Sequence, residues 1–438
     1  MLHSATFSLS FSRLRTTSTP SPLPADSLAH ALLLAARAVA AVIGGRSLPE
    51  ALAAHAGEPS RAVAQDLAYG ALRRYGLGDA LLARLIARPL AQVEPRALLL
   101  CALYRLDTRP EAAHTVVDQT VEAAGHLAKG AFRGLVNGVL RNYLRRRDEL
   151  HAALAGDDEA LHRHPAWWLR RLRAAWPDDW QGIVAAGNGQ PPMALRVNRR
   201  RVSRDDYLAQ LAAAGIEARA VGAAGVLLAR PQPVDALPGF FVGLASVQDA
   251  GAQRAAELLD LAAGQRVLDA CAAPGGKAAH ILETADVDLT ALEVDGRRAG
   301  RIGENLDRLG LAADVRVADA RDVASWWDGR PFERILADVP CSASGVVRRH
   351  PDAKWLRREA DVAGFARTQR QMLDALWPTL APGGKLLYAT CSVFPQENGE
   401  QVARFVAAQA QATLLAEERL LPQGDHDGFH YALLQKAR

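Results

Sequence analysis

The sequence predicts three folded domains: an all-α N-terminal domain, a small α+β module and a C-terminal α/β domain with a doubly wound parallel sheet. Helical periodicity fills the first third, a mixed pattern follows, and apolar runs alternate with helices from Gly264 onward. The 438 residues suit two to four domains at roughly 100 to 200 residues each. We expect a disordered arm over 1–25, the all-α domain over 26–160, the module over 161–240 and the α/β domain over 241–438.

Composition narrows the class of protein. Hydrophobic residues make up 49% of the chain, yet no uninterrupted apolar stretch reaches the roughly 18 residues of a membrane span. The four cysteines are too few and too scattered for a disulfide framework or a zinc site, so we expect no metal and a reducing cytoplasm. The net charge is +4, but nine arginines face four aspartates between residues 163 and 206. Such a patch favours a polyanionic partner.

The N-terminal third begins with 25 residues that lack acids and are rich in Ser, Thr and Pro. This composition is typical of a transit peptide or a disordered arm, and we favour the arm. Leucines then recur at helical spacing, with breaks at Pro59, Pro89 and Pro110. The last helix is expected over 132–147. Its arginines (Arg141, Arg145, Arg146 and Arg147) suit either a solvated helix end or contacts with phosphates.

The middle of the chain combines a helical stretch, an alternating strand over 193–198 and a helix over 207–215. The helical stretch carries Trp167, Trp168, Trp176 and Trp180, and tryptophans at this density are more often core residues than stacking platforms for bases. At the end of the expected strand lie Arg196, Arg199, Arg200 and Arg201. Arginine pairs well with phosphates, so these four are candidate contacts to a nucleic acid backbone.

The C-terminal domain has five apolar runs that we expect to form parallel strands: 267–269, 289–293, 315–319, 335–338 and 386–390. Ligands of such sheets bind at the carboxyl ends of the strands. The first run ends at Asp269, and Pro274, Gly275 and Gly276 then form a sharp turn into a helix that begins at Lys277. The glycines of this turn have neither the spacing of a dinucleotide-binding motif nor that of a phosphate-binding loop.

The second run ends in Glu293, and an acid at this place typically binds ribose hydroxyls. The corner therefore fits an adenosine-containing ligand without a phosphate requirement; the alternative is a tight β/α connection beside a solvated strand end. Asp319 closes the third run and suits either an adenine amino group or the capping of a loop.

The fourth and fifth runs end next to cysteines. Asp338 precedes Cys341 by three residues, and Cys391 directly follows the last run, so neighbouring strands would deliver a carboxylate and two thiols to one cleft. A thiol with a pKa of about 8.5 needs nearby cations to become a nucleophile. Lys277 or a bound sulfonium could supply that charge. For Cys341 the alternative is a small packing residue, and Cys101 is expected to be a buried hydrophobe.

These blocks resemble the RNA 5-methylcytosine methyltransferases that use S-adenosylmethionine, a family with a Rossmann-like class I methyltransferase domain. Asp269 to Lys277 looks like the cofactor loop, Asp338 to Gly345 followed by Arg348-Arg349-His350-Pro351 looks like the D-A-P-C-S block, and Thr390-Cys391-Ser392 looks like the T-C-S block. Residues 427–432 are similar to the last strand, and the helical N-terminal region is similar to the NusB-type RNA-binding domain. Val339 and Glu293 depart from the usual alanine and aspartate.

The resemblance implies methyl transfer from S-adenosylmethionine to C5 of a cytidine in 16S rRNA, cytosine 967 in the family, by a monomeric enzyme. It assigns attack on C6 to Cys391 and release of the adduct to Cys341, with Asp338 at the cytosine edge and Lys277 beside it. The implied cofactor residues are Cys271, Ala272, Ala273, Pro274, Gly275, Gly276, Lys277, Glu293, Asp319 and Asp338. The candidate RNA contacts are Arg196, Arg199, Arg200, Arg201, Arg348 and Arg349.

Two other functions compete with this one. The first is a NusB-like RNA-binding assembly factor whose methyltransferase-like domain has lost activity; the presence of Lys277, Asp338 and both cysteines argues against it. The second is a class I methyltransferase with a DNA substrate or a non-covalent mechanism. The T-C-S cysteine favours covalent C5 chemistry, and the NusB-like region favours RNA.

Overall fold

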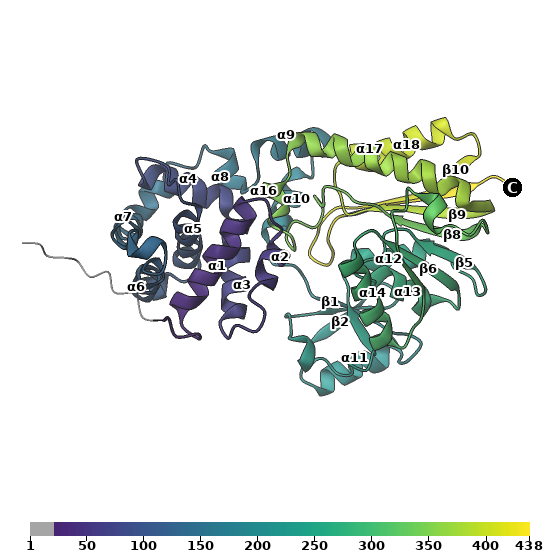
Figure 1. Cartoon of the computed structure of the whole chain (residues 1–438), viewed down its shortest axis with the longest axis horizontal. Coiled ribbons are helices and arrows are strands. Elements are labelled where there is room, and N and C mark those ends of the chain that lie inside the picture. The colour runs from purple at the N-terminus through teal and green to yellow at the C-terminus, as the bar shows by residue number, and fades with distance from the viewer. Residues whose placement is uncertain (1–21) are drawn as a thin grey trace, which may run out of the picture. The chain divides into compact units, whose positions relative to one another are not determined.

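The computed structural model describes residues 22–438, so most of the expected arm over 1–25 lies outside the described residues. The chain divides into two compact units, one ending at Gly156 and one running from Asp157 to Arg438. Figure 1 labels their helices and strands, and each unit is described by itself.

The first unit is all-α, which confirms the predicted class. Its helices are α1 (Leu28–Ile43), α2 (Leu48–Ala53), α3 (Arg61–Arg73), α4 (Tyr75–Leu85), α5 (Val93–Thr108), α6 (Ala113–Ala124) and α7 (Arg133–Ala152), with short 3-10 turns at Pro110–Ala112 and Ala128–Gly130. Ser27 caps α1 by accepting the His30 N–H, and helices α3, α5 and α6 pack around α1. Helix α7 continues beyond Arg147 to Ala152, but Arg146, with a φ of −115° and a ψ of 17°, is not helical and breaks it. The predicted end at Arg147 therefore coincides with a break in the helix.

The second unit begins with α8 (Asp158–His162), α9 (Ala166–Ala175) and α10 (Trp180–Asn188). A four-stranded antiparallel sheet follows, in the order β2-β3-β1-β4. Its strands are β1 (Ala194–Val197), β2 (Ala218–Val221), β3 (Gly225–Leu228) and β4 (Ala245–Val247), and α11 (Arg204–Ala213) packs against it. The mixed pattern in the sequence therefore gave the correct class for this module.

The second sheet of this unit has seven strands in the order β10-β11-β9-β8-β5-β6-β7. The strands are β5 (Arg266–Asp269), β6 (Asp288–Glu293), β7 (Asp314–Val317), β8 (Phe332–Asp338), β9 (Leu380–Thr390), β10 (Ala412–Leu420) and β11 (Phe429–Lys436). The five predicted strands are parallel, but β11 and β10 add an antiparallel edge. The sheet is thus mixed rather than wholly parallel. The prediction lacked β10, whose mostly exposed side chains give no apolar run.

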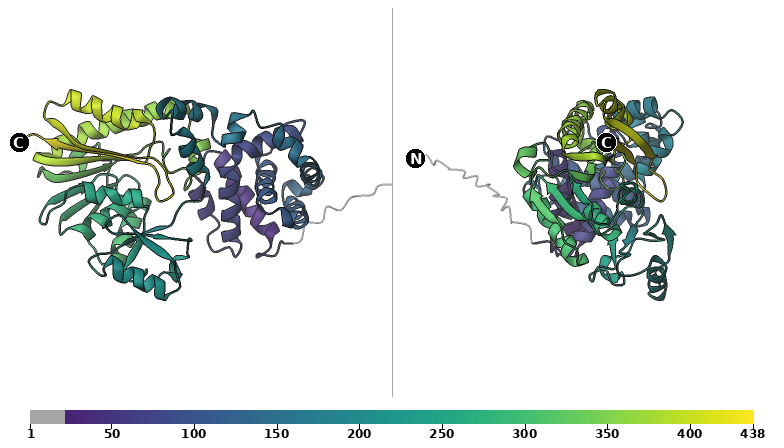
Figure 2. Two further views of the ribbon diagram at one scale, coloured as in Figure 1. Left: turned by 180° about the vertical axis from the view of Figure 1, so that it is seen from behind. Right: turned by 90° about the vertical axis from the view of Figure 1, so that its right-hand side faces the viewer.

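Helices cover both faces of this sheet, as Figure 2 shows. Helices α12 (Ala250–Leu258), α13 (Gly276–Thr284) and α14 (Gly296–Leu309) pack in one apolar core, and α17 (Glu359–Leu376) and α18 (Gly399–Ala408) pack in the other. Short helices α15 (Val323–Trp326) and α16 (Ala353–Leu356) lie in the connections. Because β5, β6, β8 and β9 are parallel neighbours, their carboxyl ends lie along one edge of the sheet.

The tryptophans of α9 and α10 are core residues, as predicted. Trp168 is buried, and Trp167, Trp176 and Trp180 pack against the same cluster. The cluster also contains Val347 and Phe394, which come from loops of the α/β domain. These helices therefore stabilise the segments that follow Cys341 and Cys391.

Candidate active site

The glycine turn after β5 has a conformation that only glycine accepts readily. Gly275 has a φ of 98°, and a Cβ there would lie 3.1 Å from the Cα of Ile302. The Ala272 N–H donates to the carbonyl of Leu292 over 2.8 Å, which ties the turn to the end of β6. The turn is thereby held open toward the carboxyl edge of the sheet.

Three acids lie at or just beyond the strand ends around this turn. Glu293 is 4% exposed and accepts from the Asp295 N–H at 3.1 Å and from Arg298 at 3.4 Å. Asp319 pairs with Arg321 at 2.7 Å, and this hydrogen bond lowers the pKa of Asp319. Asp269 is fully buried, and among residues 22–438 its Oδ2 has no hydrogen-bond partner. Burial, reinforced by the charge of Asp338, raises the pKa of Asp269 to about 7.

A cleft at the carboxyl edge contains five of the predicted cofactor residues: Cys271, Ala273, Glu293, Asp319 and Asp338. Both candidate catalytic cysteines, Cys341 and Cys391, line the same cleft. Of the other predicted residues, Ala272 and Gly275 are buried, Gly276 is half-buried and Pro274 is exposed. The sequence did not point to Arg298, Thr368 and Met372, which also line the cleft. They come from helices α14 and α17, which carry no motif.

The two thiols lie side by side. The Sγ atoms of Cys341 and Cys391 are 3.3 Å apart, and Lys277 Nζ lies 2.5 Å from Asp338 Oδ2. Burial opposes the charge of Lys277, but the carboxylate of Asp338 outweighs it and the pKa of Lys277 is raised. The hydrogen bond with Cys391, together with burial, raises the pKa of the Cys341 thiol well above its ordinary value. Cys341 is therefore held as a thiol, and Cys391 is the more exposed of the pair.

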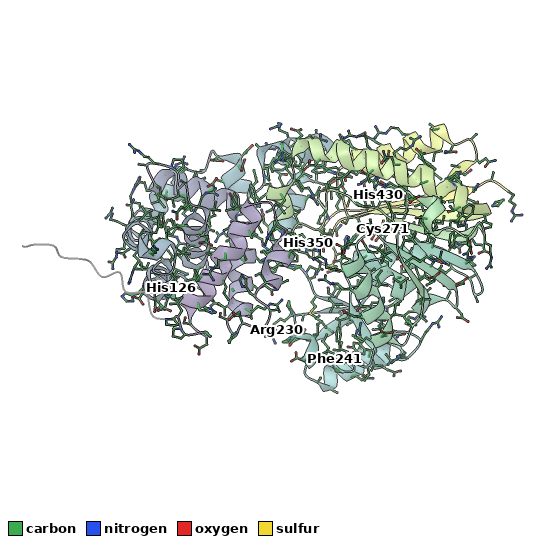
Figure 3. The ribbon with its side chains drawn as sticks, viewed as in Figure 1. His126, Arg230, Phe241, Cys271, His350 and His430 are labelled. Atoms are coloured by element: carbon green, nitrogen blue, oxygen red, sulfur yellow. The ribbon has the colours of Figure 1, made fainter. Side chains whose placement is uncertain are left out.

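The other two cysteines differ from this pair. Cys101 is completely buried in α5, and burial raises the pKa of its thiol to about 12, as expected for a packing residue. Burial, with a contribution from Asp269, also raises the pKa of Cys271 well above its ordinary value. Cys271 thus lines the cleft as a neutral side chain (Figure 3).

A buried polar network that the sequence did not reveal lies behind the thiols. Glu397 accepts four hydrogen bonds: from the Ser342 N–H at 2.8 Å, the Ser342 hydroxyl at 2.5 Å, the Ser392 hydroxyl at 2.6 Å and Gln369 at 3.1 Å. Ser342 directly follows Cys341, and Ser392 directly follows Cys391. One carboxylate therefore joins the two cysteine loops.

The structure corrects the prediction for Arg196. Its side chain is 0% exposed and donates to both carboxylate oxygens of Glu283, at 2.7 and 2.8 Å, and to Gln248 and the Gly276 carbonyl, each at 2.6 Å. A guanidinium that is buried with these acceptors cannot contact RNA phosphates, so this prediction was wrong. Arg199, Arg200 and Arg201 are exposed and remain candidates.

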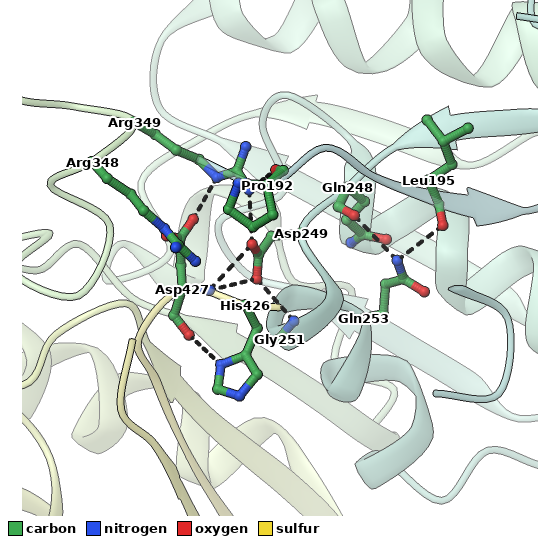
Figure 4. Close-up of polar contacts among 10 residues, drawn as sticks. All are labelled: Pro192, Leu195, Gln248, Asp249, Gly251, Gln253, Arg348, Arg349, His426 and Asp427. Carbon is green, nitrogen blue, oxygen red and sulfur yellow. Dashed lines mark hydrogen bonds and ion pairs between the residues drawn. The ribbon is translucent and has the colours of Figure 1, made fainter. Parts of the chain in front are cut away.

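The prediction for Arg348 was wrong for the same reason (Figure 4). Arg348 is 4% exposed, and its Nε donates to Asp427. Arg349 is only partly exposed and donates to Asp427 and, at 2.8 Å, to Asp249. Asp249 also accepts the Gly251 N–H at 2.8 Å, so these arginines join the loop after Cys341 to α12 and to the start of β11. Arg348 stabilises the fold, because it is buried against the opposite charge of Asp427. Arg349, whose side chain is 26% exposed, remains a candidate RNA contact.

A doubly wound sheet with a glycine turn, acids at its strand ends and paired thiols in one cleft defines a class I methyltransferase with candidate cysteine chemistry. Among the described residues we find no helix able to cross a membrane, and none of their acids, histidines and cysteines cluster as metal ligands.

Comparisons with known proteins agree with this class. The 16S rRNA methyltransferase RsmB/F family matches residues 256–435, the RsmF/B-like ferredoxin-like domain matches 164–235, and the NusB family matches 30–145. Ribosomal RNA small subunit methyltransferase B of Pseudomonas putida is 47% identical over 426 residues, which cover 92% of this chain and 98% of that protein. The same-named protein of Pseudomonas syringae pv. tomato is 46% identical over 431 residues, covering 92% and 96%.

The fold also matches a solved structure, PH0851, with a TM-score of 0.79 at 21% identity, covering 95% of this chain and 100% of that one. The chain belongs to the family of ribosomal RNA small subunit methyltransferases B. It is a 16S rRNA methyltransferase with a NusB domain at its N-terminus.

Proposed function

We propose that this enzyme transfers a methyl group from S-adenosylmethionine to C5 of one cytidine of 16S rRNA through a covalent bond between Cys391 and C6. The observation that carries the proposal is the pair of thiols 3.3 Å apart beside the Lys277–Asp338 ion pair. Cytosine 967, the site of the related family, is the target we propose.

The cleft fits S-adenosylmethionine, which supplies an electrophilic methyl group when it is bound. Glu293 offers carboxylate oxygens to ribose hydroxyls, and Asp319 offers an acceptor for the adenine amino group. Asp269 fits a ligand amino group, because its buried Oδ2 has no partner among the described residues. Cys271 and Ala273 line the cleft without charge, which suits a ligand that carries no phosphate.

The two cysteines and the Lys277–Asp338 ion pair carry out attack on the base and release of the product. Cys391, near the Lys277 ammonium, adds to C6 of the base, and the added electrons reach C5 through the resulting enamine. Asp338 accepts or shares a proton at the N3 and amino edge of the cytosine. After C5 has received the methyl group, its proton passes to a base from the solvent and the C5–H electrons form the C5–C6 double bond. The electrons of the Cys391–C6 bond leave with the sulfur as a thiolate. Cys341, held as a neutral thiol against Cys391, assists this last step by donating a hydrogen bond to the departing thiolate.

An RNA substrate explains the presence of the NusB domain and of the exposed arginines. The target base has to leave its stack to reach the cleft, at a cost of a few kcal/mol. The NusB domain and the exposed Arg199, Arg200 and Arg201 would bind flanking RNA and offset that cost. We propose that the enzyme acts as a monomer in the cytoplasm, where rRNA is made in bacteria.

Bisulfite sequencing of 16S rRNA tests this function. A strain without the gene should lose one protected cytosine, and the wild-type gene should restore it. The Cys391→Ala gene should not restore it, because nothing is left to add to C6. Loss of no cytosine on deletion would contradict the function, and full restoration by Cys391→Ala would contradict the covalent mechanism.

A further inference from the structure

The two cysteine loops follow different strands, β8 and β9. Cys341 lies 50 residues before Cys391, yet their Sγ atoms are 3.3 Å apart. Backbone hydrogen bonds join the two segments at two points: the Val339 N–H donates to the Ala389 carbonyl at 3.1 Å, and the Gly345 N–H donates to the Cys391 carbonyl at 2.9 Å. Between these points, side-chain contacts help to fix the spacing of the thiols.

Glu397 makes those contacts to both loops at once. Its Oε2 accepts the hydroxyls of Ser342 and Ser392 at 2.5 and 2.6 Å, and its Oε1 accepts the Ser342 N–H at 2.8 Å. The carboxylate is 0% exposed, so water cannot replace these bonds. Its own position is fixed, since its backbone carbonyl accepts the Tyr388 hydroxyl at 2.6 Å and Gln369 donates to its Oε1 at 3.1 Å.

We propose that Glu397 is a positioning residue that sets the spacing of the Cys341 and Cys391 thiols. The hydroxyls of Ser342 and Ser392 both lie within hydrogen-bond distance of the same oxygen, so the carboxylate joins the residues next to the two cysteines. Ser344 belongs to the same network, with its Oγ 3.0 Å from Ser342 Oγ and 2.9 Å from Ser392 Oγ. Burial raises the pKa of Glu397, and the serine donors oppose that shift. Without this acceptor, two serine hydroxyls and one backbone N–H would lose their shared partner. The spacing of the loops would then depend on Ser344, whose Oγ accepts the Val393 N–H at 2.9 Å and lies 2.9 Å from Ser392 Oγ.

The first test measures the spacing in the full-length protein without any substrate. Diamide accepts two electrons and two protons from a pair of thiols, and the rate at which the Cys341–Cys391 disulfide forms reports their proximity. We expect Glu397→Ala to slow this reaction by roughly tenfold to a hundredfold. Glu397→Gln should lie between, because the amide keeps one acceptor oxygen. Glu400→Gln is the matched control: Glu400 is exposed, lies three residues on, and pairs with Arg404 at 3.7 Å on the surface of α18.

The second test rests on the proposed function, since it follows the covalent adduct with RNA. Misplaced thiols should slow the release step more than cofactor binding, so Glu397→Ala should accumulate denaturant-resistant adduct at unchanged cofactor affinity. If Glu397→Ala does not fold, Ser392→Ala and Ser342→Ala decide the matter, because each removes one donor and should slow disulfide formation severalfold. A wild-type oxidation rate in these variants would overturn the proposal. Slow oxidation without any adduct in any variant would support the positioning role and contradict the covalent mechanism alone.

Discussion

The two units of the chain are stabilised by different means. In the helical unit, leucines and alanines fill the core, and the buried polar side chains among the described residues are few: Ser60, Thr120 and the carboxylate of Asp107, which is 5% exposed. In the second unit, buried polar groups occur throughout, from Arg196 to His430, and many surround the active-site cleft. Apolar burial has no direction, whereas a hydrogen bond fixes distance and angle. The second unit therefore uses hydrogen bonds and ion pairs where the chemistry requires loops at fixed distances.

The largest effect on stability is expected when the buried Arg196 of the second unit is replaced. Arg196→Met would leave Glu283 buried without its cation, and we expect the free energy of unfolding of the second unit to fall by about 3 to 5 kcal/mol. All eight tryptophans lie between Trp167 and Trp377, so tryptophan fluorescence in urea reports this unit.

Two substitutions serve as controls for that measurement. Arg199→Met changes an exposed arginine three residues on and should alter the free energy by less than about 0.5 kcal/mol. Thr120→Val removes a hydroxyl that donates only to the Val116 carbonyl of its own helix, and it should cost the helical unit about 1 kcal/mol by circular dichroism. An Arg196→Met loss as small as that of Arg199→Met would remove the contrast between the units.

A smaller effect is expected at Glu293. Glu293→Ala should weaken the binding of S-adenosylmethionine by about 1 to 3 kcal/mol, because ribose hydroxyls would lose their acceptor. Isothermal titration calorimetry measures this affinity directly. Asp295→Ala is a suitable control, since Asp295 caps α14 through the Arg297 N–H, is half-buried and does not belong to the residues that line the cleft. An unchanged affinity in Glu293→Ala would show that Glu293 does not bind the ribose hydroxyls.

The smallest effect is expected at the exposed arginines. Replacement of Arg199 and Arg200 by glutamate should weaken RNA binding and flatten its dependence on salt, while the affinity for the cofactor stays the same. A series of binding measurements between low and moderate salt gives the slope. Equal slopes for the variant and the wild type would show that these arginines do not contact phosphates.

Local patterns explain what the sequence could predict. Strands β5, β6, β8 and β9 end at the predicted residues, because each is a buried apolar run that stops at an acid or at the T-C-S block. Strand β7 ends at Val317, two residues before the predicted end, since Asp319 pairs with Arg321 in the following loop. The sequence thus located the cleft, its acids and both thiols.

The sequence could not predict contacts between side chains that are distant along the chain. Arg196 and Glu283 are 87 residues apart, and nothing near Arg196 indicates that a carboxylate will cover it. The role of Glu397 is hidden for the same reason, since its partner Ser342 is 55 residues away. Charge runs in a sequence therefore do not separate RNA contacts from buried ion pairs until the packing is known.

The central claim is that the adjacent thiols have different tasks, and one gel measures it. Each cysteine variant is incubated with 16S rRNA and S-adenosylmethionine, denatured and separated. Cys391→Ala should form no protein–RNA adduct, because the nucleophile is absent. Cys341→Ala should accumulate the adduct, because attack and methyl transfer proceed while release is slow. An adduct with Cys391→Ala and none with Cys341→Ala would reverse the two tasks, and an adduct with neither would contradict the covalent account.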